Sequence, residues 1–129
     1  MRRKLFHLYL TVIVISTGFS CESDLMDDQV QIRIMNNSSF EYSDVQVNTS
    51  GGENFYGTIS PNMYSDYKKY EFAYRYAFVE LKIGDATYTL QPIDYVGEEV
   101  LSFGKYTYEI EAASAGGQYE RLSLRLIED

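Results

Sequence analysis

Histidine and cysteine, the side chains that most often supply bases, nucleophiles and metal ligands, occur once each in this chain of 129 residues, as His7 and Cys21. Both precede the part of the chain that has the composition of a folded domain. A serine nucleophile needs a base beside it, and only scattered lysines remain for that role. No G-x-S-x-G, P-loop or dinucleotide-binding glycine motif occurs. The sequence therefore predicts a protein that is not an enzyme and has no cofactor.

Carboxylates are the other groups that could do chemistry. Asp94, Glu98 and Glu99 lie close together in a stretch with Pro92 and Gly97, which is typical of a loop between strands. Their oxygens could bind calcium weakly or act as an acid pair. Solvation of a connecting loop accounts for the same residues, and we adopt that interpretation, so no metal site is predicted.

Tyrosine is the residue type whose distribution stands out. The chain has 13 tyrosines and no tryptophan. Exposed tyrosine rings suit sugar stacking or protein contact, because a rigid ring gives contact area at a small cost in entropy. The alternative is that most of the rings fill the core of a tryptophan-free domain. The candidate binding residues, a tyrosine run interleaved with basic side chains, are Tyr64, Tyr67, Lys68, Lys69, Tyr70, Tyr74, Arg75 and Tyr76.

The first 20 residues have the order of a secretory signal peptide. Arg2, Arg3 and Lys4 are followed by an almost unbroken apolar run over 5–15 and then by small residues up to Cys21. The apolar run is shorter than the roughly 20 residues that a membrane-spanning helix needs. Removing residues 1–20 leaves 8 basic and 19 acidic side chains, a net charge of −11. Such a surface repels phosphate backbones, so nucleic acid is excluded as a partner, and solubility explains the acidity.

The stretch Gly18-Phe19-Ser20-Cys21 resembles a relaxed lipobox of the kind found in small Bacteroidota-type outer-membrane lipoproteins. Ser20 matches the small residue of that motif, whereas Phe19 and Gly18 depart from it. The resemblance implies that Cys21 carries a covalent lipid, which would anchor the protein to the membrane at ~0.8 kcal/mol per buried methylene.

Acidic residues follow Cys21 at once, at positions 22, 24, 27 and 28. A charged run of this kind is typical of a solvated tether. It also resembles the signal that sends such lipoproteins to the cell surface. The implied organisation is a signal peptide at 1–20, a lipidated cysteine and tether at 21–28, and one domain at 29–129, held in the cell envelope at the outer membrane, with attachment to its external or its periplasmic leaflet as alternatives.

Alternation of apolar and polar residues dominates the chain from residue 29 onward, which predicts strands with one buried face. The segment 64–83 is ambiguous. Tyr67, Tyr70, Tyr74, Phe78 and Leu81 would form a helical stripe, and a helical turn over 65–69 is a further alternative. We favour a strand with a change of face at Phe78, followed by a hairpin turn at Gly84-Asp85. Strands are also expected over 30–34, 45–47, 55–59, 86–90, 106–110 and 122–126, with a hairpin loop at 114–117.

Seven or eight short strands within about 100 residues are the signature of an all-β fold, here a single small antiparallel β-sandwich. Residues 101–108 have the pattern L-x-x-G-x-Y-x-Y, which resembles a strand of immunoglobulin-like, fibronectin-like and transthyretin-like sandwiches. The resemblance implies that Tyr106 is a tyrosine corner, whose hydroxyl bonds back to the preceding turn.

Two functions follow as hypotheses. The first is a membrane-anchored, non-enzymatic protein-interaction or accessory module of the cell envelope. The alternative is a carbohydrate-binding surface lipoprotein that uses exposed tyrosines. Coplanar exposed tyrosines would favour glycans, whereas an exposed apolar patch would favour an envelope protein as partner.

Overall fold

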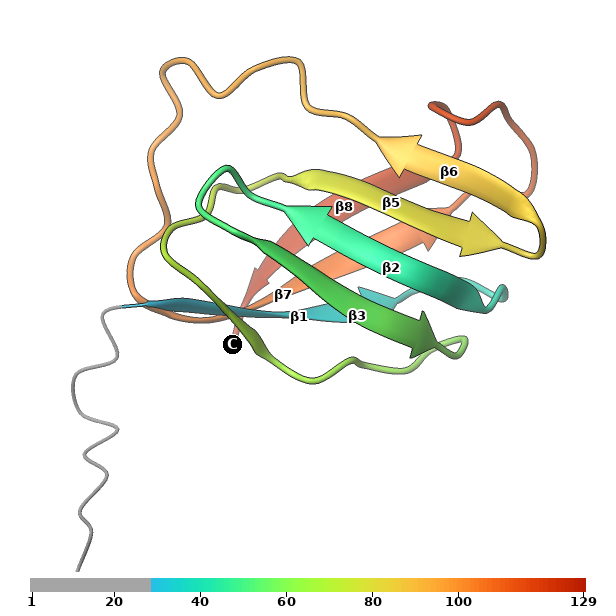
Figure 1. Cartoon of the computed structure of the whole chain (residues 1–129), viewed down its shortest axis with the longest axis horizontal. Coiled ribbons are helices and arrows are strands. Elements are labelled where there is room, and N and C mark those ends of the chain that lie inside the picture. The colour runs from blue at the N-terminus through green and yellow to red at the C-terminus, as the bar shows by residue number, and fades with distance from the viewer. Residues whose placement is uncertain (1–28) are drawn as a thin grey trace, which may run out of the picture.

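Eight strands in two four-stranded sheets make up the computed structural model, which describes residues 29–129 (Figure 1). The first sheet has the order β4-β1-β7-β8 and the second the order β3-β2-β5-β6. The predicted all-β sandwich is confirmed. No helix in this part of the chain is long and apolar enough to cross a membrane. The predictions for residues 1–28 lie outside the described residues. The strands are β1 (Val30–Asn36), β2 (Tyr42–Asn48), β3 (Glu53–Ile59), β4 (Lys68–Tyr70), β5 (Phe78–Ile83), β6 (Ala86–Leu90), β7 (Gly104–Ala112) and β8 (Leu122–Glu128).

One strand pair corrects the expectation of a wholly antiparallel sandwich. β1 and β7 run parallel, from Val30 opposite Gly104 to Asn36 opposite Ile110. Parallel strands need a long crossover, and here the chain passes through both sheets between the two strands. In an immunoglobulin domain the first two strands share a sheet, whereas β1 and β2 lie in different sheets. The observed strand order therefore differs from the immunoglobulin-like one.

The core lies between the sheets and follows the alternation of the sequence. On β1, Val30, Ile32 and Ile34 are fully buried, and Gln31 and Arg33 between them are not. Apolar side chains of the other strands meet them, so each sheet buries one face against the other, as a sandwich requires. The core also includes Tyr42, Val45, Val47, Ile59, Tyr70, Ala73, Ala77, Val79, Leu81, Tyr106, Tyr108, Ile110 and Leu122.

The segment 64–83 agrees with the predictions made for it only in part: the helical stripe and the helical turn are wrong, and the favoured strand forms at its end. Only Phe78–Ile83 forms the expected strand, Lys68–Tyr70 forms the short β4, and residues 71–77 are irregular, with no helix or helical turn. The reason is topological. β4 belongs to one sheet and β5 to the other, so the chain must leave the first sheet and cross to the second.

The crossing segment, residues 71–77, is fixed by the loop at residues 49–51. The Thr49 hydroxyl donates to the Phe72 carbonyl oxygen at 2.8 Å, and the Glu71 amide donates to the Gly51 carbonyl oxygen at 3.0 Å. A side chain at Gly51 would place its Cβ only 2.1 Å from the Phe72 carbonyl oxygen, so glycine is required there. The predicted turn at Gly84-Asp85 joins β5 to β6, and the predicted loop around 114–117 joins β7 to β8.

Candidate contact surface

Tyr70, from the predicted tyrosine cluster, belongs to the core. It is 1% exposed, and its hydroxyl lies 2.9 Å from the Tyr56 hydroxyl, which in turn donates to the Ile32 carbonyl oxygen at 2.8 Å. Burial raises the pKa of Tyr70 to about 12 and raises the pKa of Tyr56 as well. Tyr70 is thus a structural residue that no ligand can reach.

Tyr64 and Tyr67 lie on the outer face of the β4-β1-β7-β8 sheet, where both rings contact Arg33. The Arg33 guanidinium carbon is 4.0 Å from the Tyr64 ring centroid and 5.0 Å from that of Tyr67. The Tyr67 hydroxyl donates to Asp129 at 2.6 Å, and the Thr107 hydroxyl donates to the same carboxylate at 2.7 Å. Tyr64 remains 52% exposed. These contacts tie the 64–67 segment and the carboxyl-terminal residue to the sheet.

Tyr74 and Tyr76 lie in the crossing segment and contact the loop at residues 91–103. The Tyr74 ring stacks on the Tyr95 ring with centroids 4.5 Å apart. The backbone carbonyl oxygen of Tyr74 accepts a 2.6 Å hydrogen bond from the Tyr108 hydroxyl. The Tyr76 hydroxyl donates to Glu98 at 2.9 Å. The five tyrosines therefore occupy three separate environments and do not form one platform.

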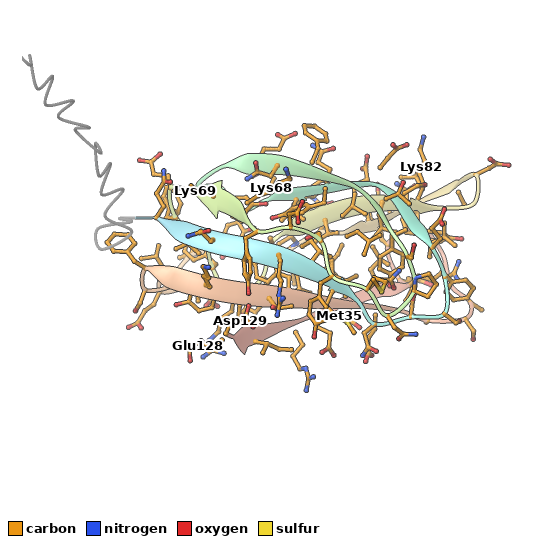
Figure 2. The ribbon with its side chains drawn as sticks, turned by 90° about the horizontal axis from the view of Figure 1, so that it is seen from below. Met35, Lys68, Lys69, Lys82, Glu128 and Asp129 are labelled. Carbon is orange, nitrogen blue, oxygen red and sulfur yellow. The ribbon has the colours of Figure 1, made fainter. Side chains whose placement is uncertain are left out.

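The basic residues of the predicted cluster lie in two places, Lys68 and Lys69 on β4 and Arg75 on the crossing segment. The Lys68 ammonium lies 5.9 Å from the Tyr56 ring centroid, and Arg75 is an exposed residue of the crossing segment. The Lys69 carbonyl oxygen accepts a hydrogen bond from the Asn54 amide at 2.9 Å. Figure 2 shows Lys68 and Lys69 near the start of β1 and far from Lys82, which belongs to the other sheet.

Exposed apolar side chains gather at another place. Of the nine large hydrophobic residues that are exposed within 29–129, five belong to the crossing segment and the 91–103 loop. This loop runs along the end of the sandwich at which β1 and β7 begin (Figure 1). Val96, for example, is 88% exposed. We call this surface the loop end and define it by Tyr76, Ile93, Val96, Val100 and Phe103. A hollow of about 320 Å³ adjoins it, lined by Tyr76, Leu90, Ile93, Leu122 and neighbouring residues.

The 91–103 loop is held in place although its apolar tips are exposed. The Leu101 amide donates to the Ala73 carbonyl oxygen at 2.8 Å, and the Tyr106 hydroxyl donates to the Ser102 carbonyl oxygen at 2.8 Å. The second bond runs four residues back along the chain, as the tyrosine corner prediction for Tyr106 requires. The loop thus presents its apolar side chains from a backbone that the sandwich fixes at several points.

The carboxylates of this loop bond to neighbours in the loop and the crossing segment. Asp94 accepts from the Val96 amide at 2.8 Å, and Glu98 accepts from the Tyr76 hydroxyl. Among the described residues, no three histidine, cysteine, aspartate or glutamate side chains are placed to hold a metal ion. We call Asp94, Glu98 and Glu99, which belong to the same loop, the acidic rim of the loop end.

The sequence did not predict the loop end, because its apolar residues follow neither the strand period nor the helix period. Ile93, Val96, Val100 and Phe103 stand in a stretch that contains proline and glycine and that was interpreted as a solvated connection. Several large apolar residues in a stretch with neither strand nor helix periodicity were the available signal, since such residues cannot all turn toward a core.

The buried tyrosines predict a pH dependence of stability. In an unfolded chain a tyrosine titrates near pH 10, whereas burial raises the pKa of Tyr70 to about 12 and also raises those of Tyr56 and Tyr108. Above pH 10 the unfolded chain loses protons that the native chain keeps. We therefore expect these groups to leave the free energy of unfolding unchanged below about pH 10. Above that pH, each buried tyrosine should lower the free energy of unfolding by about 1.4 kcal/mol for every pH unit until its native pKa is reached.

Tyrosinate absorbance recorded together with far-ultraviolet circular dichroism during an alkaline titration would check this. The expected result is a group of tyrosines that ionise only as the strands unfold. Ionisation of every tyrosine near pH 10 with the strands intact would contradict it.

No protein-family model matches the chain, and no curated protein is similar to it. Its structure is similar to the NMR structure of a protein from Eubacterium rectale, with 13% sequence identity and a TM-score of 0.49, over 79% of this chain and 89% of that one.

Proposed function

We propose that this protein is a lipid-anchored, non-enzymatic interaction module of the cell envelope that binds a protein partner through its loop end. The observation that carries the proposal is the group of five exposed apolar side chains at one end of a small sandwich whose core is otherwise well buried. Exposed apolar side chains that gather in one place mark contact sites, whereas single ones need no explanation. A rigid backbone beneath them limits the entropy lost on binding.

The chemistry of the partner follows from the rim of the loop end. Asp94, Glu98 and Glu99 are interleaved with the exposed apolar residues along the loop and add negative charge to it, and the predicted mature chain is itself acidic. An anionic lipid surface would repel such a rim. A protein surface with an apolar centre and lysines or arginines around it is complementary to both features.

The anchor restricts where this partner can lie. β1 begins at Val30, nine residues after Cys21, and nine extended residues span at most about 30 Å. Val30 pairs with Gly104, which directly follows the 91–103 loop, so the start of β1 and the loop end lie at the same end of the sandwich (Figure 1). A lipid on Cys21 would thus hold the loop end close to the membrane, and the partner we propose is a membrane-seated protein.

Site-specific photo-crosslinking in the native cells tests this proposal. A photoreactive amino acid replaces Val96 in one strain and Tyr119, an exposed residue on the loop between β7 and β8, in the control strain. We expect a defined protein crosslink from position 96 that drops at least tenfold when Ile93→Ser and Phe103→Ser are added, and that Lys or Arg substitutions in the acidic rim also weaken.

Three outcomes would contradict the proposal. They are crosslinks from position 96 to lipid alone, equal crosslinks from positions 96 and 119, and crosslinks that the two serine substitutions leave unchanged. Circular dichroism of the serine variant confirms that it is folded, which is expected because both side chains are exposed.

A further inference from the structure

The outer face of the β3-β2-β5-β6 sheet carries a row of residues that crosses all four strands. Phe55 of β3 is opposite Gln46 of β2, Gln46 is opposite Glu80 of β5, and Glu80 is opposite Thr89 of β6. The four strands lie side by side in Figure 1. Phe55 is 64% exposed and lies outside the loop end, so its ring is open to a ligand on this face.

The sheet is hollowed beside this row. A concavity of about 340 Å³ is bordered by Phe55, Gln46, Glu80, Lys82 and Thr87, which is within the size range of small-molecule sites. Two backbone features accompany it. β2 has a bulge with Asp44 at a φ of 48°, and Gly57 on β3 has a φ of 69° and open space where a side chain would stand.

Hydrogen bonds and an ion pair hold the polar side chains around the concavity. The Thr89 hydroxyl donates to Glu80 at 3.4 Å, and the Lys82 ammonium lies 3.5 Å from the Asp44 carboxylate. Gln46 donates to Glu53 through its amide nitrogen. One aromatic ring thus adjoins amide, hydroxyl, ammonium and carboxylate groups, and Glu80 is the one carboxylate at its border without a cationic partner among the ion pairs of the described residues.

We propose that this concavity binds a neutral saccharide, with one sugar face on the Phe55 ring and sugar hydroxyls on Gln46, Glu80, Lys82 and Thr87. A sugar offers an apolar face of C–H groups for an aromatic ring and hydroxyls that both donate and accept hydrogen bonds. Glu80 disfavours uronic or sialic acids, because their carboxylates would lie near its own. The proposal is independent of the proposed protein partner, since it uses another face of the molecule.

Binding of the full chain to immobilised oligosaccharides tests the assignment. The protein is extracted in a detergent without a sugar headgroup and applied to neutral and acidic oligosaccharides of the same lengths. The best neutral one is then titrated into the wild type, Phe55→Ala, Gln46→Ala and a control, Tyr119→Ala, which removes an exposed ring elsewhere. We expect at least tenfold weaker binding for Phe55→Ala, several-fold weaker binding for Gln46→Ala, and no change for the control.

The proposal is overturned if no neutral oligosaccharide binds, if acidic ones bind more tightly, or if Phe55→Ala binds as the wild type does. Loss of binding in Tyr64→Ala with Phe55→Ala unaffected would likewise overturn it and would place the sugar on the outer face of the other sheet. Phe55 is exposed, so its variant is expected to fold, and circular dichroism verifies that.

Discussion

Replacing Tyr70 by alanine is expected to lower the free energy of unfolding by about 3–5 kcal/mol, the range for truncating a large buried aromatic side chain. Tyr70 is 1% exposed between the sheets and shares a hydroxyl contact with Tyr56. Alanine would leave a cavity between the sheets and would remove a partner from the Tyr56 hydroxyl. Tyr70→Phe keeps the ring and should cost only about 1 kcal/mol, which is the ordinary value of one hydrogen bond.

Urea denaturation followed by circular dichroism measures these differences. Tyr119→Ala is the matched control, because its ring is exposed and its removal should change stability by no more than about 0.5 kcal/mol. If Tyr70→Ala were as stable as Tyr119→Ala, Tyr70 would not be part of the core.

Asn36→Ala is expected to cost about 3 kcal/mol, because each buried carbonyl left without a donor costs about 1–3 kcal/mol. Asn36 ends β1 and is fully buried. Its amide nitrogen donates to the carbonyl oxygens of Phe40 at 2.7 Å and Ile59 at 3.0 Å, and its amide oxygen accepts from the Ser38 hydroxyl at 2.6 Å. One side chain thus fixes the end of β3 and the loop that leads into β2.

The same denaturation experiment applied to Asn54→Ala provides the comparison. Asn54 donates to the Lys69 carbonyl oxygen at 2.9 Å, but that bond is exposed to water, so its loss should cost less than about 1 kcal/mol. If the two substitutions lowered the free energy of unfolding equally, water would be hydrogen-bonding the Phe40 and Ile59 carbonyl oxygens in the Asn36 variant.

Most strands could be predicted from alternation alone, because one buried face per strand leaves a period of two in the sequence. Val30, Ile32 and Ile34 carry that pattern clearly, and β1, β2, β6, β7 and β8 formed where it occurs. The pattern is the same for parallel and antiparallel neighbours, so the parallel pairing of β1 with β7 could not be read from it. Pairing depends on contacts far apart in sequence, such as Val30 with Gly104.

The crossing segment shows a different limit. Residues 71–77 contain aromatic and small residues that fit a strand locally, yet they connect two sheets. Their conformation is set by Gly51, whose missing side chain allows the Phe72 carbonyl group to approach. A glycine in a turn twenty residues earlier gives no local sign of such a contact.

The candidate contact surface was the least predictable part. The tyrosine run has a composition that suits binding, but composition does not show which rings face the core. Tyr70 is buried while Tyr64, six residues earlier, is half exposed, since they lie on opposite sides of one sheet. Ile93 and Val96 follow neither the strand period nor the helix period, so their exposure could be seen only in the folded structure.

The mass of the amino-terminal peptide, measured on the protein purified from its own cell envelope, tests the lipid anchor on Cys21. We expect a mature chain that begins at Cys21, carries diacylglycerol in thioether linkage and is recovered in the outer-membrane fraction. An unmodified Cys21 thiol, or a chain that retains residues 1–20, would contradict the anchor, and the proposal of a membrane-seated partner at the loop end would lose its geometric basis.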